Sequence, residues 1–375
     1  MIDRKLESVI RKKMDDKDKK VIVIYGARQV GKTTLLNKIF KNQKDTYWLN
    51  GDESTTQSLF ENFDVEKARR IVGDAKTIVI DEAQKIENIG LKLKILYDNF
   101  GDKVQFIATG SSSFDLANKI NEPLTGRKWV YRMFSLSIEE LVKENGYVKE
   151  NSNLENRLIY GSYPAVINNP ANAEEILKNL ANDNLYRDIL NFGEIIKTDY
   201  LQKILQALAF QIGSQVNINE ISNLLGIDRK TVDKYISLLE QSFVIFRLKS
   251  YNKNLRNELK KSQKIYFYDL GIRNALINDF RPAELRNDLG DLFENYIVAE
   301  FEKKKYSLVG PDSYFWRTTD GQEVDYILSK NGELKAYEMK WKKMNVRFPE
   351  SFINEYTPAS IEVINRDNYI DFFVE

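Results

Sequence analysis

The stretch at residues 26–33 constrains the fold of this chain more than any other. It reads Gly-Ala-Arg-Gln-Val-Gly-Lys-Thr, with a continuous apolar run before it (21–25) and helical apolar spacing after it (34–40). A strand, a glycine-containing loop and a helix in this order surround a phosphate with backbone N–H groups, and the N-terminus of the helix favours an anion. The pattern therefore predicts a nucleotide-binding loop beside a parallel sheet.

The predicted nucleotide site includes the whole loop and the residue after it. Lys32 is expected to reach the β- and γ-phosphates, and Thr33 is expected to hold Mg²⁺. Backbone and neighbouring contacts are assigned to Gly26, Ala27, Arg28, Gln29, Val30, Gly31 and Thr34. ATP and Mg²⁺ are therefore the predicted cofactors.

Composition limits the available chemistry. The 375 residues include no cysteine and no histidine, so disulfides and thiolate or imidazole metal ligands are excluded, and carboxylates, lysines or water must move protons. A net charge of +1 means that any nucleic-acid site must be a local patch. No apolar run approaches the length of a membrane span, which predicts a cytoplasmic protein with no membrane partner.

A second apolar strand, expected at residues 77–82, ends in Asp81 and Glu82. Continuous apolar residues are typical of a strand that is buried on both faces of a parallel sheet, and acids at its carboxyl end lie where ligands bind. Asp81 is expected to act at the Mg²⁺ ion and Glu82 to polarise the attacking water.

Another expected strand (104–109) is followed by a small polar cluster (110–113). Thr109 and Ser111 are candidates for sensing the γ-phosphate, although such clusters also cap helices or form turns. Arg127 follows a glycine in a turn and is a candidate arginine finger for the nucleotide of a neighbouring subunit. The alternative is an ordinary surface arginine.

At this point the chain resembles a known family, the prokaryotic AAA-type ATPases with a C-terminal DUF4143 region. The likeness depends on residues 23–33, 80–86, 109–112 and 124–127, and it continues at 134–141, 161–164 and 186–189. The resemblance implies an AAA+-like core in which Arg127 is the family's characteristic arginine.

Residues 137–198 are expected to be mostly helical and to form a lid over the nucleotide, since apolar residues recur at three- and four-residue steps. Arg187 in this segment is either a second phosphate-sensing arginine or a structural one.

A winged helix-turn-helix is predicted at 217–248. Its first helix would point Ile221, Leu224 and Leu225 inward, and Gly226 would make the turn. The second helix would bury a stripe of Val232, Ile236 and Leu239 and expose Arg229, Lys230 and Lys234. Such a helix either enters the major groove of DNA or serves for packing.

Near the C-terminus, Asn331-Gly332 predicts a two-residue hairpin turn. If residue 330 pairs with 333, then Asp325 faces Glu338, with their Cβ atoms about 5 Å apart. Two carboxylates at this distance repel unless a cation lies between them. Lys340, two residues beyond Glu338, points to the same face.

This region resembles the PD-(D/E)xK nuclease fold. The resemblance implies that Glu294 is the helix acid, that Asp325 and Glu338 are metal ligands for Mg²⁺ or Mn²⁺, and that Lys340 activates water. Lys342 and Lys343 would add positive charge for phosphates, or form a solvated face. A surface hairpin with a salt bridge, or the same fold without cleavage, are the alternatives.

Together these features predict an α/β chain of three domains: a P-loop NTPase (AAA+-like) parallel sheet with a helical lid (1–198), a winged helix-turn-helix (199–252) and a restriction-endonuclease-like α/β domain (253–375). The predicted function is ATP hydrolysis coupled to DNA binding or metal-dependent cleavage, in a homo-oligomer with Arg127 acting in trans. The alternative is an ATP-switched DNA- or protein-interaction protein that does not cleave.

Overall fold

The computed structural model describes residues 2–41, 43–111, 120, 122–184, 197–252, 263–305, 311–342 and 346–374. The chain divides into two compact units. The first unit consists of Met1–Phe134 and Gln241–Phe243, and the second of Ser135–Glu240 and Val244–Glu375. Arg187, Ser112, Ser113 and Lys343 lie outside the described residues. Within the described ranges, no helix has the length and apolarity that a membrane crossing requires.

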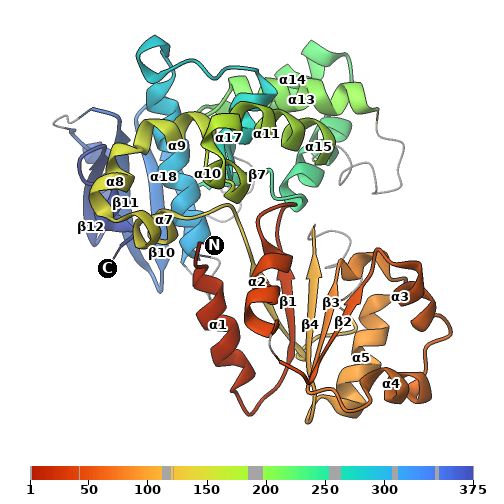
Figure 1. Ribbon diagram of the computed structural model, residues 1–375. Helices are drawn as coiled ribbons and strands as arrows, with labels where there is room; N and C mark the ends of the chain where they lie inside the picture. Colours follow the sequence, from red (N-terminus) through yellow and green to blue (C-terminus); the bar gives the residue numbers. More distant parts are fainter. Residues whose placement is uncertain are drawn as a thin grey trace. The chain divides into compact units, whose positions relative to one another are not determined.

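The first unit is a parallel sheet with helices on both sides (Figure 1). Its elements are α1 (Lys5–Met14), β1 (Val21–Tyr25), α2 (Lys32–Phe40), β2 (Thr46–Asn50), α3 (Ser54–Leu59), α4 (Val65–Val72), β3 (Thr77–Asp81), η1 (Ala83–Lys85), α5 (Ile89–Phe100), β4 (Gln105–Gly110) and β5 (Lys128–Arg132). Strands β1, β3 and β4 are buried along their whole length, as their apolar runs predict.

The strand order is β2-β3-β4-β1-β5, so β4 lies between the strand that precedes the glycine loop and the strand that ends in Asp81. All pairs are parallel, and the carboxyl ends of these three strands meet at one edge of the sheet. The α/β class with a parallel sheet is confirmed.

The second unit contains a seven-stranded mixed sheet in the order β12-β11-β10-β9-β7-β8-β6. Its strands are β6 (Gln215–Val216), β7 (Ile245–Ser250), β8 (Gln263–Phe267), β9 (Asp312–Arg317), β10 (Glu323–Lys330), β11 (Glu333–Lys340) and β12 (Ser360–Asn365). Its helices are α7 (Ile138–Asn145), α8 (Tyr147–Ser152), α9 (Leu154–Tyr160), α10 (Pro164–Asn168), η2 (Pro170–Asn172), α11 (Ala173–Asn179), η3 (Leu180–Asn184), α13 (Thr198–Phe210), α14 (Ile218–Leu225), α15 (Arg229–Gln241), α17 (Leu270–Leu276), η4 (Ala283–Leu285), α18 (Leu289–Lys305), α19 (Glu350–Tyr356) and η5 (Tyr369–Phe372).

The helices that were expected to form a lid over the nucleotide belong to the second unit. Glu300 of α18 accepts a hydrogen bond from the backbone N–H of Ile138 at 2.8 Å, and the side chain of Asn274 donates to the carbonyls of Leu158 and Ile159. The expected domain boundary at residue 198 therefore does not coincide with the division into units. Helical periodicity predicts an apolar stripe, but it does not tell which neighbour covers that stripe.

The helix-turn-helix segment forms α14 and α15, separated by Gly226 in a left-handed conformation (φ 65°). In α15 the predicted stripe of Val232, Ile236 and Leu239 is buried. The prediction for Leu224 is wrong, because this side chain is 73% exposed. Helix α14 has only eight residues, and Ile221 is the residue that it buries.

Around this pair, β6 pairs with β8 and β8 pairs with β7, antiparallel in both cases. Strand β7 also pairs in parallel with β9, through Lys249 with Tyr314 and Ser250 with Phe315. The strands expected for the wing and those expected for the nuclease-like domain therefore belong to one sheet, and the expected boundary at residue 252 falls inside it.

The predicted hairpin is confirmed. Strands β10 and β11 pair from Lys330 with Glu333 to Tyr326 with Tyr337, and Asn331 and Gly332 both have positive φ angles (53° and 86°). Positive φ at both turn residues is the geometry that Asn-Gly favours. The pairing of β10 with β9 is irregular between Val324 and Ile327, which places a bulge at Asp325 and Tyr326.

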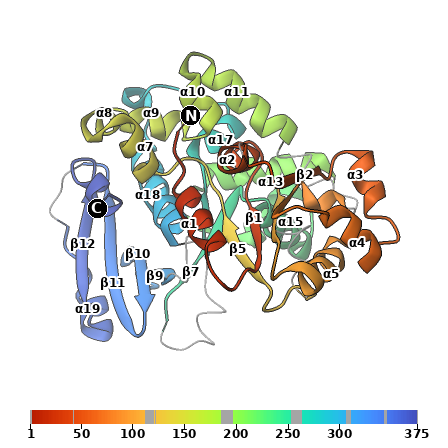
Figure 2. The ribbon, with the colours of Figure 1, turned by 60° about the horizontal axis from the view of Figure 1, so that its bottom comes forward.

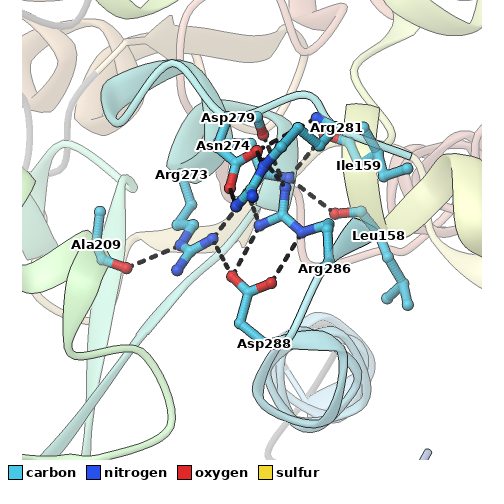
Figure 3. Close-up of polar contacts among 9 residues, drawn as sticks. All are labelled: Leu158, Ile159, Ala209, Arg273, Asn274, Asp279, Arg281, Arg286 and Asp288. Carbon is cyan, nitrogen blue, oxygen red and sulfur yellow. Dashed lines mark hydrogen bonds and ion pairs between the residues drawn. The ribbon is translucent and has the colours of Figure 1, made fainter. Parts of the chain in front are cut away.

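A buried network of charges joins α17, the segment after it and the start of α18 (Figure 3). Arg273 donates to the Ala209 carbonyl (2.8 Å) and to Asp288 (2.9 Å), and Arg286 makes two bonds of 2.8 Å to Asp288. Arg286 also donates to the backbone carbonyl of Asp279. Both arginines are buried, so each guanidinium group needs these partners to offset the cost of removing its charge from water.

The substitution Asp288→Ala is expected to lower the free energy of unfolding by about 3 kcal/mol, because it leaves two buried guanidinium groups without their shared carboxylate. The matched control is Arg281→Ala, which removes an ion pair with Asp279 in which the arginine side chain is 58% exposed, and which should cost less than about 1 kcal/mol. Urea denaturation of both variants measures the difference. Equal losses in the two variants would contradict a structural role for the network.

Candidate functional site

The glycine loop lies between β1 and α2, at the carboxyl edge of the parallel sheet. Gly26 has no room for a side chain, because a Cβ atom would lie 2.1 Å from the carbonyl oxygen of Met133. Gly31 has φ 99°, a conformation that side chains rarely allow. Both glycines are therefore needed for the path of the loop.

Lys32 folds back over the loop. Its Nζ atom donates to the carbonyl oxygens of Gly26 (2.7 Å) and Ala27 (2.9 Å), and the side chain is buried. The ammonium group of Lys32 therefore lies against the backbone of the loop. Thr34 is exposed on the first turn of α2.

Asp81 connects the loop to the two neighbouring strands. The Thr33 hydroxyl donates to Asp81 Oδ2 at 2.6 Å, and the Thr109 hydroxyl donates to Asp81 Oδ1. The backbone N–H of Glu82 bonds to the Thr109 oxygen at 3.2 Å. Thr33, Asp81 and Thr109 come from α2, β3 and β4, and the strand order brings them together.

Glu82 is held in place by its backbone and by a neighbour. Its φ and ψ angles (47° and 42°) are left-handed, and its carboxylate accepts a hydrogen bond from Gln84 at 2.5 Å. Gln84 also donates to Ser111 Oγ at 3.2 Å, so the two predicted residues Glu82 and Ser111 share one buried amide.

Two oxygen donors of this site fit Mg²⁺. Thr33 Oγ1 and Asp81 Oδ2 are within hydrogen-bond distance of each other, and hydroxyl and carboxylate oxygens are ligands that this hard cation prefers.

Arg127 lies at the opposite edge of the sheet. Lys128 pairs with Val21, the first residue of β1, whereas the glycine loop follows Tyr25, the last residue of that strand. Four residues of strand separate the two levels by about 13 Å. The Arg127 Nε atom donates to Asp98 of α5 at 2.7 Å, and the side chain is 37% exposed.

Sequence reasoning missed three residues at the nucleotide site. Arg4 donates to the Val30 carbonyl of the loop and to the Phe134 carbonyl, both at 2.7 Å. Gly51 lies so close to the end of β3 that a Cβ atom would be 2.3 Å from the Glu82 carbonyl. Gln84 is the third. For Gln84 the sequence offered two signals, its proximity to Glu82 and its place in the segment 80–86 that carries the family resemblance.

In the second unit, Asp325, Glu338 and Lys340 come together as predicted. Lys340 Nζ is 2.7 Å from Glu338 Oε1 and 3.8 Å from Asp325 Oδ2, and Asp325 also accepts a hydrogen bond from the backbone N–H of Met339 (2.8 Å). Burial raises the pKa of Asp325 well above its usual value, and the negative charges of Glu294 and Glu338 raise it further.

Glu294 has a different partner, which the sequence did not reveal. Lys264 of β8 is 1% exposed and forms ion pairs with Glu294 (2.9 Å) and with Glu323, and the Tyr266 hydroxyl donates to Glu294 at 2.6 Å. Burial lowers the pKa of Lys264, but the charges of Glu294 and Glu323 outweigh it and raise this pKa above its usual value. Lys264 therefore stays charged.

The fit of a divalent cation at these acids is partial. Glu338 Oε2 is buried and has no hydrogen-bond partner in the described part of the chain, so one carboxylate oxygen beside Asp325 is open to a cation. Glu294 is already neutralised by Lys264. Among the described residues, no three acidic side chains have the mutual spacing of a metal site.

Comparison with protein families assigns three segments of the chain. Residues 18–142 match the model described as AAA domain, 151–283 match a domain of unknown function (DUF8612), and 289–369 match a domain of unknown function (DUF4143). The middle match spans both expected domain boundaries, at 198 and at 252. The AAA and DUF4143 matches confirm the recognition made from the sequence motifs.

Similar curated proteins are uncharacterized. They include one from Mycobacterium tuberculosis (25% identical over 327 residues, 85% of this chain and 70% of the relative), one from Haemophilus influenzae (27% over 363 residues, 89% and 85%) and one from Methanocaldococcus jannaschii (27% over 354 residues, 81% and 73%).

Solved structures with a similar chain include a signal transduction ATPase with numerous domains from Pyrococcus horikoshii (15% identical, TM-score 0.31) and the Pif1 helicase from Bacteroides (17% identical, TM-score 0.26). The matches cover 81% and 49% of this chain but only 46% and 51% of those chains. Likeness at these TM-scores supports no argument about function.

Proposed function

Because residues 18–142 match an AAA domain and residues 289–369 match a DUF4143 domain, we propose that the chain binds and hydrolyses ATP at the carboxyl edge of its parallel sheet. The observation that carries the proposal is the pair of hydrogen bonds from Thr33 and Thr109 to the Asp81 carboxylate. They bring together the loop threonine and the strand aspartate, the residue types that hold Mg²⁺ beside the phosphates in P-loop enzymes, which supports the proposal.

In this proposal the N–H groups of the loop 26–31 and Thr34 surround the phosphates, and Lys32 exchanges its two carbonyl acceptors for phosphate oxygens. Thr33 and Asp81 hold Mg²⁺, which neutralises phosphate charge when bound. Glu82 accepts a proton from the attacking water while Gln84 orients its carboxylate. Thr109 and Ser111 respond to the γ-phosphate.

Arg127 acts on the nucleotide of a neighbouring subunit. Its place at the opposite edge of the sheet prevents it from reaching the nucleotide of its own chain, and its single exposed ion pair with Asp98 is easily exchanged. A homo-oligomer in which each Arg127 completes the next site makes use of this position.

For the second unit we propose contact with DNA through α15. Arg229, Lys230 and Lys234 are exposed, and Asp233 is partly neutralised by an ion pair with Arg247 (2.8 Å). The order of β6, β8 and β7 beside α14 and α15 supports a winged helix fused to the C-terminal sheet.

Two outcomes are open for the acids of the C-terminal sheet. Metal-dependent DNA cleavage by Asp325, Glu338 and Lys340, with Mg²⁺ or Mn²⁺, is favoured by the open oxygen of Glu338. A nuclease-like fold that binds without cleaving, in an ATP-switched assembly, is favoured by Lys264, because this buried cation already neutralises Glu294.

Lys32→Ala is expected to weaken ATP binding by about a hundredfold or more, because it removes the cation at the β- and γ-phosphates. Glu82→Gln should keep ATP binding and reduce turnover by about a hundredfold, because the amide cannot take the proton. Nucleotide affinity and steady-state phosphate release separate the two effects. Turnover like that of the unaltered protein in either variant would overturn the proposed roles.

The role of Arg127 in trans predicts complementation between two inactive variants. Arg127→Ala removes the finger and keeps the nucleotide site, whereas Lys32→Ala removes the nucleotide site and keeps the finger. Mixing them should restore part of the ATPase activity, because mixed oligomers place an intact Arg127 beside an intact site. If the ATPase activity of the mixture equals only the sum of the activities of the two variants, Arg127 does not act in catalysis.

Cleavage of DNA is tested on the full chain with Mg²⁺ or Mn²⁺. Asp325→Ala and Lys340→Ala should each abolish a genuine activity, and Asp320→Ala, which changes an exposed acid in the turn before β10, should leave it unchanged. Cutting that persists in both site variants comes from elsewhere. Absence of cutting with either ion, with DNA binding retained, selects the fold that does not cleave.

A further inference from the structure

A cavity of about 500 Å³ lies in the second unit between the end of α18 and the outer half of the β10–β11 hairpin. Figures 1 and 2 show α18 running beside these strands. The cavity is separate from the acids around Asp325, because its strand residues lie from Leu328 to Tyr337, around the hairpin turn.

The hairpin presents one face to this cavity. Leu328 pairs with Lys335, and Lys330 pairs with Glu333, so the lining residues follow the two-residue period of strands. Regular alternation without a bulge in this pairing fixes which side chains face the cavity. The site is therefore part of the rigid hairpin.

The inner lining is aromatic. Phe301 and Tyr337 are buried with ring centres 4.9 Å apart, and Phe372 meets the ring of Tyr337 at 6.1 Å in an edge-on arrangement. Burial raises the pKa of the Tyr337 hydroxyl to about 12, so it remains a neutral hydrogen-bonding group at physiological pH. An aromatic wall of this kind suits the flat ring of a ligand.

The outer lining is cationic, with four lysines against one glutamate: Lys304, Lys305, Lys330, Lys335 and Glu333. Lys305 is 3.0 Å from Ser313 Oγ and 3.8 Å from Glu302 Oε2, which partly offsets its charge, and Lys304 is 3.3 Å from the Phe372 carbonyl. Lys330 and Lys335 have no ion-pair partner in the described ranges. Cations gathered in this way favour an anion between them.

We propose that this cavity binds a mononucleotide, with the phosphates at the lysines and the base against the aromatic wall. The volume lies within the range of about 300–1,000 Å³ that small-ligand sites occupy, and an apolar interior with a few polar groups is their usual lining. Phosphate and a flat ring are the two features that the lysines and the aromatic side chains together select. The site is additional to the glycine loop and independent of the proposed ATPase activity.

The test uses the full chain carrying Lys32→Ala, which weakens the glycine-loop site, and calorimetric titration with ADP and with inorganic pyrophosphate. One ADP per chain should bind, more tightly than pyrophosphate, and Lys330→Glu or Lys335→Glu should each weaken ADP at least about tenfold. Lys149→Glu is the matched control, since it makes the same charge change at an exposed lysine of α8 and should leave the affinity within about twofold.

Three results would overturn the proposal: no saturable ADP binding, binding that survives both lysine variants, or binding of a single-stranded oligonucleotide without binding of ADP. Pyrophosphate that binds as tightly as ADP would overturn the contact with the base. Lys330 and Lys335 are exposed, so unchanged thermal unfolding of their variants is expected, and Lys330→Gln and Lys335→Gln should give smaller losses of the same sign.

Discussion

The nucleotide site depends on the hydrogen bonds that the Asp81 carboxylate accepts. This carboxylate accepts hydrogen bonds from Thr33 and Thr109, which lie far from it in the sequence but beside it in the sheet. In the sheet, β4 lies between β1 and β3, and the carboxyl ends of these parallel strands bring Thr109 and the loop to the same edge as Asp81.

The second unit depends on a different kind of constraint, charges buried between helices. Arg273, Arg286 and Asp288 fix the start of α18 relative to α17, and Asn274 connects the same region to the end of α9 through two carbonyls (Figure 3). Desolvation makes such groups costly, so removal of one partner is far more harmful than loss of an exposed pair. The helices that the sequence suggested as a lid are attached here by polar contacts as well as by their apolar stripes.

Features set by neighbouring residues could be predicted from the sequence. The Asn-Gly turn correctly predicted the pairing of β10 with β11 as far as Tyr326 and Tyr337. The glycine loop lies between a strand and a helix, as its flanking residues indicated. The apolar stripe of α15 is buried, as its helical period predicts. Leu224 was misassigned because a two-turn helix offers too few positions to define its buried face. A local sequence pattern predicts structure well where a single backbone geometry satisfies it.

Long-range partners could not be predicted in this way. Lys264, Arg273 and Arg286 resemble ordinary surface charges in the sequence, and only the packing of distant elements removes them from water. Arg4, the residue before α1, supports the glycine loop, and no sequence motif indicates this contact. An ion pair between segments leaves no periodic signal, whereas an apolar stripe does.

The acids of the C-terminal sheet show how such a partner changes a functional argument. The resemblance to nucleases predicted Glu294, Asp325 and Glu338 at one metal site, but the three carboxylates have different partners. Lys264 neutralises Glu294 from inside the protein, whereas Lys340 is half-buried and contacts Glu338 through one oxygen only.

A divalent ion at this site would therefore be held by Asp325 and Glu338, and it would compete with Lys340 rather than with Lys264. Burial raises the pKa of Asp325 well above its usual value, and the negative charges of Glu294 and Glu338 raise it further. In the proposed metal site, an external cation and Lys340 would compete for two carboxylates, and Glu294 would act on Asp325 through its charge.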